Sequence, residues 1–137
     1  GLAAEECARV DADLDVQATQ AVEVPAIAKL VRRAVRNLLE NARRYSHGAI
    51  RLQLAREGNM AVIRVEDVGP GVPPSQRERI FEKFYRLPGA SERSGGVGLG
   101  LSLVRSIAQR HGGSVVCEDR LDGLQGASFV LRLPLKL

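Results

Sequence analysis

Two short runs of alternating apolar and polar residues constrain the fold of this chain more than any other feature. The runs are Ile50 to Arg56 and Met60 to Glu66, and Glu57-Gly58-Asn59 lies between them. Alternation places every second side chain on the same face of a strand, and a short glycine-containing connection is typical of a hairpin. The sequence therefore predicts an antiparallel β-hairpin with one apolar face that must be buried.

Helices on one side of the sheet can bury that face. From about Pro25 to Tyr45, apolar residues recur at helical spacing, and Ser46 to Gly48 end the segment. Further elements are a helix from about Leu99 to Arg110, strands at Ser114 to Asp119 and Ala127 to Leu133, and short β-like pieces between Asp13 and Val24. Strands and helices do not alternate regularly, which disfavours a doubly wound parallel sheet. We expect an α+β fold, a two-layer α/β sandwich whose mixed, mostly antiparallel sheet packs on helices.

The composition is that of one globular domain over residues 1–137, with residues 1–12 as an arm or linker from an upstream domain. With 4% aromatic residues the core should be aliphatic. No apolar run has the ~20 residues of a membrane span. Cys7 and Cys117 lack the spacing of a metal site or a disulfide framework, which suits a reducing cytosol. The net charge of +4 does not indicate nucleic-acid binding, because no aromatic residues interleave with the arginines.

One edge of the first helix carries side chains that could serve a ligand. At 100° per residue, Asn37, Asn41 and Arg44 fall beside the apolar stripe, and Tyr45 falls on it. An amide oxygen can ligate Mg²⁺, and an arginine can bind a phosphate. Because asparagines on helices are usually solvated, this pattern does not decide the function by itself.

Two glycine-containing segments give further signals. "EDVGPGV", Glu66 to Val72, places a carboxylate at the end of a buried strand, where a flat ligand can approach the backbone, although a plain turn has the same composition. Gly95, Gly96, Gly98 and Gly100 lead directly into the second helix, whose free N–H groups and dipole attract phosphate. The glycines alternate with Val and Leu, which is unlike a flexible linker. The sequence predicts a phosphate site there.

Five motifs in order resemble those of a known family. They are "NLLEN" (Asn37 to Asn41), "DVGPG" (Asp67 to Gly71), "IFEKFYR" (Ile80 to Arg86), "GVGLGL" (Gly96 to Leu101) and "GASF" (Gly126 to Phe129). They look like the N box, first glycine box, F box, second glycine box and third glycine box of a sensor histidine kinase ATP-binding domain. That domain has the Bergerat fold of the GHKL ATPase superfamily. The resemblance covers roughly Val24 to Pro134.

The resemblance implies a Mg²⁺-ATP site and two catalytic residues, Asn41 and Arg44. Asn41 would ligate Mg²⁺, Arg44 would contact phosphate, and Tyr45 would lie against the adenine. Asp67 would accept a hydrogen bond from the 6-amino group of adenine. The other nucleotide-binding residues implied are Asn37, Gly69, Gly71, Val72, Gly96, Gly98, Leu99, Gly100 and Leu101.

The resemblance also implies that Val72 to Gly95, including Phe81 and Phe84, form a mobile lid that closes over ATP. Many relatives have threonine where Val97 and Ala127 stand here, so no hydroxyl is available at those two points.

Three alternatives stay open. Superfamily hydrolases resemble each other in having a glutamate general base four residues before the Mg²⁺-binding asparagine, where this chain has the neutral Asn37, while Glu40 lies on the opposite helix face. An anti-sigma-factor serine kinase is a second alternative. A degenerate domain that binds nucleotide only as a structural ligand is the third, and the presence of Asn41 and Asp67 disfavours it.

Neither His47 nor His111 is placed as a phosphate acceptor, since both fall at helix ends. The family's acceptor histidine lies on an upstream dimerisation helix. We expect the chain to be the cytoplasmic catalytic portion of a membrane-bound, homodimeric sensor kinase with a response regulator as downstream partner. The isolated domain should be a monomer.

Overall fold

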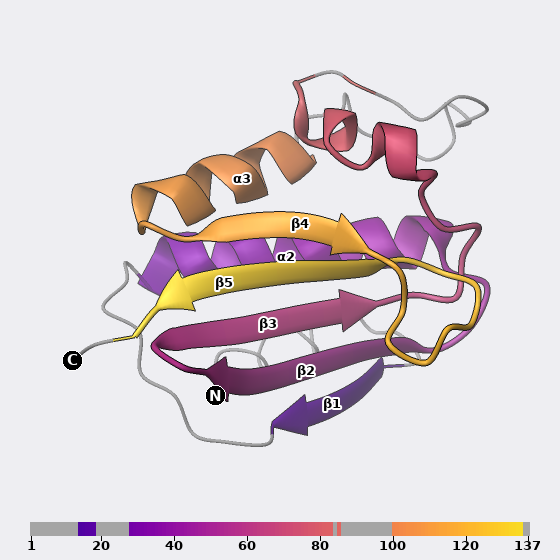
Figure 1. Cartoon of the computed structure of the whole chain (residues 1–137), viewed down its shortest axis with the longest axis horizontal. Coiled ribbons are helices and arrows are strands. Elements are labelled where there is room, and N and C mark those ends of the chain that lie inside the picture. The colour runs from indigo at the N-terminus through magenta and orange to yellow at the C-terminus, as the bar shows by residue number, and fades with distance from the viewer. Residues whose placement is uncertain (1–13, 19–27, 84, 86–99, 136–137) are drawn as a thin grey trace.

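In the part of the chain that the structure describes, a five-stranded sheet and two α-helices form two layers (Figure 1). The computed structural model describes residues 14–18, 28–83, 85 and 100–135. The strands are β1 (Leu14–Ala18), β2 (Ile50–Glu57), β3 (Met60–Glu66), β4 (Ser114–Glu118) and β5 (Ser128–Pro134). The helices are α2 (Ala28–Tyr45), α3 (Gly100–Arg110) and two 3₁₀ turns, η1 (Pro74–Gln76) and η2 (Arg79–Phe81).

The sheet has the strand order β1-β2-β3-β5-β4. Strands β2 and β3 form the predicted hairpin, in which Glu57 pairs with Met60 and only Gly58 and Asn59 form the turn. The β3–β5 and β5–β4 pairs are also antiparallel. Strand β1 runs parallel to β2, with Leu14 opposite Ile50. The prediction of a two-layer sandwich with a mixed, mostly antiparallel sheet is therefore confirmed.

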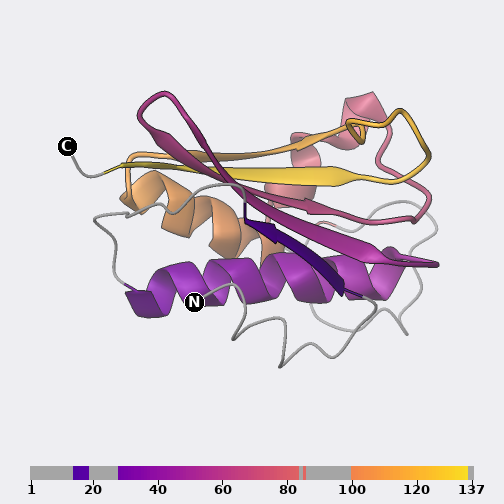
Figure 2. The ribbon, with the colours of Figure 1, turned by 90° about the horizontal axis from the view of Figure 1, so that it is seen from below.

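Both α-helices lie on the same face of the sheet (Figure 2). The core between the layers is aliphatic, as predicted, apart from Phe81 and Phe129, whose rings meet edge to face with centroids 6.3 Å apart. Helix α2 contributes Val31, Ala34, Val35, Leu38, Leu39 and Ala42. Burial raises the pKa of the Cys117 thiol, which is free, to about 12. No helix among the described residues is long and apolar enough to cross a membrane.

The described part of the segment after β3 contains two short helical turns that the sequence does not predict. Its first part contains η1 and η2, and Ile80 and Phe81 are buried in the core. The remaining residues of the expected lid, Phe84 and 86–95, lie outside the described residues, as do the expected arm at 1–12 and the expected start of the first helix at Pro25.

Candidate functional site

Helix α2 brings its polar edge next to the start of α3. The side-chain amide of Asn37 donates to the main-chain oxygen of Gly100, the first residue of α3, at 3.3 Å. One turn further along, Asn41 is half-buried, and within the described residues no hydrogen bond to its side chain is recorded. Arg44 is exposed in the last turn, and Tyr45 is half-buried. Asn37 therefore joins the predicted edge to the N-terminus of the second helix, and Asn41 lies one turn further along with no recorded side-chain partner among the described residues.

The end of α2 is held against the loop that follows β3. The Ser46 hydroxyl oxygen accepts a hydrogen bond from the Val68 N–H at 2.9 Å, and the His47 N–H donates to the Val68 main-chain oxygen at 3.0 Å. A Cβ atom at Gly69 would collide with the main-chain oxygen of Tyr45, so only glycine fits this close approach. Asp67 and Tyr45, which are 22 positions apart, are thus kept close together.

Asp67 is a buried carboxylate with one oxygen fixed and one available. Its side chain is only 2% exposed. Oδ1 accepts hydrogen bonds from the N–H groups of Gly69 at 2.9 Å and Ala127 at 3.1 Å. Among the described residues no donor to Oδ2 is recorded. An ionised carboxylate only accepts hydrogen bonds, so Oδ2 can take one from a ligand N–H group.

The environment of Asp67 shifts its titration. Burial raises the pKa of the Asp67 carboxyl above its usual value, because a desolvated carboxylate is disfavoured. The N–H groups of Gly69 and Ala127, together with the charge of Arg120, oppose this shift, and Glu66 adds to it. A buried carboxyl with a raised pKa and an available oxygen is typical of a functional site.

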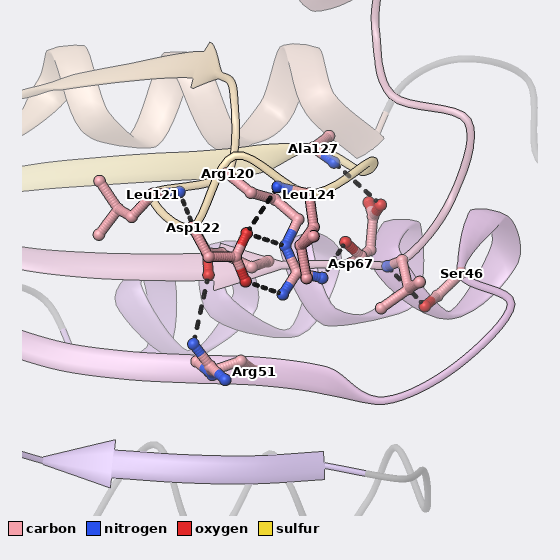
Figure 3. A network of polar contacts seen from close by, with 10 residues as sticks. Ser46, Arg51, Asp67, Arg120, Leu121, Asp122, Leu124 and Ala127 are labelled. Atoms are coloured by element: carbon pink, nitrogen blue, oxygen red, sulfur yellow. Dashed lines mark hydrogen bonds and ion pairs between the residues drawn. The ribbon is translucent and has the colours of Figure 1, made fainter.

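The loop between β4 and β5, residues 119–127, covers Asp67 from the other side (Figure 3). The Arg120 side chain donates from Nη1 to the Asp67 main-chain oxygen at 3.0 Å. The Leu121 N–H donates to the buried Glu66 carboxylate at 3.1 Å, and Arg51 lies 3.9 Å from the other oxygen of Glu66. The loop of residues 119–127 is therefore joined to the end of β3 and to Asp67 by a network of polar contacts.

Val72 is fixed by an arginine of the following segment. The Val72 main-chain oxygen accepts from Arg77 Nε at 2.9 Å, and Arg77 Nη2 forms an ion pair with Asp119 at 2.6 Å. Gly71 precedes Val72, and Leu101 follows Gly100 in α3. The predicted site residues Gly96, Gly98 and Leu99 lie outside the described residues.

Three contributors to this site were not predicted. Ser46 was interpreted only as a helix stop, Ala127 only as a departure from threonine, and Arg120 was not considered. The "SHG" and "GASF" segments were both noted, but nothing in them indicates that the Ser46 hydroxyl and the Ala127 N–H would reach the loop at Asp67. Arg120 precedes the turn-forming Asp122-Gly123, which is typical of an exposed turn.

The sequence model of the family described as histidine kinase-, DNA gyrase B-, and HSP90-like ATPase matches residues 26–137. The chain belongs to this family. It is 47% identical over 108 residues to the sensor protein RstB of Escherichia coli strain K12, a match that covers 78% of this chain and 24% of RstB. The chain spans about a quarter of the length of the curated relatives that it matches.

Solved histidine kinase structures have the same fold. The mycobacterial sensor histidine kinase MprB superposes with a TM-score of 0.84 at 28% identity, covering 98% of this chain and 94% of that structure. The full-length ShkA structure, in complex with AMPPNP, has a TM-score of 0.76 at 27% identity and covers 98% of this chain and 28% of that one. The predicted resemblance to the catalytic, ATP-binding domain of sensor histidine kinases is thereby confirmed.

Proposed function

We propose that the chain binds Mg²⁺-ATP and donates the γ-phosphate to a histidine on a separate dimerisation and phosphoacceptor domain. One observation carries this proposal: the buried Asp67 carboxylate has Oδ1 fixed by two N–H groups, while Oδ2 has no recorded donor among the described residues. Such an acceptor suits the 6-amino group of adenine. A structural relative, ShkA, was solved with the nucleotide AMPPNP.

In this proposal the nucleotide extends from Asp67 toward the start of α3. The adenine lies against Tyr45 and the loop of Gly69, Gly71 and Val72. The phosphates lie at the N-terminus of α3, where the helix dipole and the N–H groups of the first turn favour negative charge. The Asn37–Gly100 contact supports this arrangement because it keeps α3 beside the polar edge of α2. Arg44 is proposed to contact phosphate, and the residues proposed to cradle the phosphates are Gly96, Gly98, Leu99, Gly100 and Leu101.

The residues present fit a magnesium ion that is held mainly by nucleotide. Asn41 offers a half-buried amide oxygen without a recorded hydrogen bond in the described part of the chain. Within that part, no three His, Cys, Asp or Glu side chains are grouped to hold a metal. Mg²⁺ commonly uses one or two protein ligands together with phosphates and waters. The ion would neutralise phosphate charge, and Asn41 would orient it.

Transfer to a protein is favoured over hydrolysis. Asn37 stands where hydrolases of the superfamily have a glutamate base, and its amide donates to Gly100. A neutral amide cannot take a proton from water, so hydrolysis lacks an activated nucleophile.

Residues 72–95 are proposed to close over ATP, with Ile80 and Phe81 anchoring the first part of this lid in the core.

The whole protein is proposed to be a two-component sensor kinase. The relatives named sensor proteins are about four times longer than the matched segment, so the acceptor histidine and dimerisation helix are assigned to a part outside this chain. The parent is proposed to be a membrane-bound homodimer with this domain on the cytoplasmic side. A response regulator would receive the phosphate, and the isolated domain would be a monomer.

Phosphate transfer tests the proposal. The chain is mixed with a dimerisation domain that carries the acceptor histidine, in the presence of γ-labelled ATP and Mg²⁺. Acid-labile label should appear on the acceptor, and Asn41→Ala should abolish it because the ion is no longer oriented. Asn59→Ala, in the exposed β2–β3 turn, serves as the matched control and should transfer normally. Acid-stable label on serine, or equal transfer by the Asn41→Ala variant, would contradict the proposal.

A further inference from the structure

Arg120 is a nearly buried arginine that the proposed chemistry does not use. Its side chain is 8% exposed although it belongs to a surface loop. Nη1 donates to the main-chain oxygen of Asp67 at 3.0 Å, while Nε and Nη2 donate to the two carboxylate oxygens of Asp122 at 3.0 and 2.6 Å. The guanidinium therefore joins the loop of residues 119–127 to Asp67, whose Oδ2 has no recorded donor among the described residues.

The loop that carries Arg120 is itself held in place. Asp122 Oδ1 also accepts from the Leu124 N–H at 3.0 Å, which closes the turn. The Leu121 N–H donates to Glu66, the residue before Asp67, whose side chain is 1% exposed. A Cβ atom at Gly126 would collide with the Asp67 main-chain oxygen and would approach Arg120 Cδ to 2.8 Å. The loop and the Asp67 backbone are therefore packed together without spare room.

These contacts fix Asp67 on every side except the ligand side. Its N–H donates to the Ala127 main-chain oxygen at 3.0 Å, and its Oδ1 accepts from the Ala127 and Gly69 N–H groups. Arg120 fixes the remaining main-chain atom, the carbonyl oxygen. The two peptide groups that flank the Asp67 Cα are thus each held by a hydrogen bond, the first through the Asp67 N–H and the second through the Asp67 C=O. Together with the two bonds to Oδ1, they set the direction of the side chain before a ligand arrives. Such preorganisation reduces the cost of ordering on binding.

We propose that Arg120, held by Asp122, is a positioning residue that aims the Asp67 carboxylate at the adenine of ATP. The inference rests on the proposed nucleotide-binding function and names the part of the chain that sets its base recognition. Arg120 contacts the Asp67 main chain and not the carboxylate, so it leaves Oδ2 available to the ligand. Its positive charge also favours the ionised form of Asp67.

Calorimetry with two ligands tests this role. The full chain is titrated with ATP and with inorganic triphosphate, both with Mg²⁺. In the Arg120→Met variant the ATP affinity should fall about tenfold, because one charged hydrogen bond that fixes Asp67 is lost. Triphosphate affinity should not change, since triphosphate lacks the base. The matched control is Arg132→Met, whose arginine lies 3.7 Å from Glu57 at the other end of β5 and should leave both affinities unchanged.

A double variant tests whether Arg120 affects ATP binding through Asp67 or only by supporting the fold. If Arg120 acts through Asp67, the double variant Asp67→Asn with Arg120→Met should bind ATP no more weakly than Asp67→Asn alone. Additive losses, or an equal loss for triphosphate, would overturn the inference. If Arg120→Met does not fold, Asp122→Asn decides. It keeps the acceptor oxygen for Leu124 but removes the negative charge and the acceptor of Arg120 Nη2, so Arg120 is held less firmly. Full ATP affinity there overturns the inference. A parent chain that binds triphosphate as tightly as ATP would instead overturn the proposed function itself.

Discussion

At the scale of single residues, Asp67 shows a conflict between stability and binding. Its burial raises the pKa of the carboxyl, so the folded state binds the proton more tightly than the unfolded chain does. Above that pKa the ionised group therefore lowers the free energy of unfolding, and below it the penalty disappears as pH falls toward the ordinary aspartate range. The protein keeps an energetically unfavourable charge at the place where the proposed ligand would use it.

Asp67→Asn should separate these two effects. The amide oxygen can still accept from Gly69 and Ala127, so the fold is kept and the desolvated charge is removed. Calorimetry should show ATP binding roughly ten- to a hundred-fold weaker, as expected for a lost hydrogen bond to a charged acceptor. Thermal unfolding at pH 7 should occur at a higher temperature than in the parent chain, and the difference should shrink in acid.

The control for this prediction is Glu57→Gln, which neutralises a carboxylate whose side chain is 55% exposed, at the opposite end of the β2–β3 hairpin. It should leave ATP affinity unchanged. An Asp67→Asn variant that unfolds at a markedly lower temperature than the parent at pH 7, or that binds GTP and ATP as the parent does, would refute the interpretation of Asp67.

Sequence patterns located Asp67 but not the residues that hold it. The aspartate was identifiable because it ends an alternating strand and is followed by two glycines. Arg120 is 53 positions away, and its contact depends on the register between β3 and β5, which places Asp67 beside Ala127. Local composition does not determine such a register, so a buried arginine was indistinguishable from an exposed turn residue.

At the scale of elements, local periodicity predicted where the helices and strands lie, but it did not predict how all the strands pair. The β2–β3 hairpin, α3 and the last two strands were found within one or two residues, because each has a clear alternating or helical pattern. The parallel pairing of β1 with β2 was not predicted, since its partners are 36 positions apart and joined through a helix. The sequence does not predict η1 and η2, because the two buried residues of this segment, Ile80 and Phe81, are too few to show a period.

Arg77 should hold this segment on the sheet. It connects the Val72 main-chain oxygen to Asp119 at the end of β4. In Arg77→Met both contacts are lost, so amide hydrogens between residues 74 and 82 should exchange with solvent faster, because the local opening costs less free energy. Exchange in α2 should not change. Hydrogen–deuterium exchange followed by mass spectrometry measures both segments in one experiment.

The matched control is Arg56→Met, which removes a comparable arginine contact, to the main-chain oxygen of Gly58, in the distant hairpin. It should leave residues 74–82 protected as in the parent. Equal protection of that segment in the Arg77→Met variant would show that Ile80 and Phe81 alone hold it, without help from the arginine.

At the scale of the whole molecule, the order of five motifs predicted the family, and the fold shows how two of them come together. The N box on α2 and the first glycine box after β3 are joined through Ser46 and Gly69, although neither motif alone is specific. The second glycine box lies mostly outside the described residues, so its role stays a prediction.

The isolated chain should bind ATP and hydrolyse it only slightly faster than the uncatalysed background. General-base assistance typically supplies 10²- to 10⁴-fold, and Asn37 cannot provide it. Positioning of the γ-phosphate, which dominates catalysis in phosphoryl transfer, has no effect until an acceptor is present. Phosphate release measured at saturating Mg²⁺-ATP should therefore stay near background in the parent chain and in Asn41→Ala alike, while an added acceptor domain should start turnover only in the parent. Rapid phosphate release by the chain alone would assign it to the hydrolase branch of the superfamily and would show that the neutral amide at Asn37 is not what limits hydrolysis.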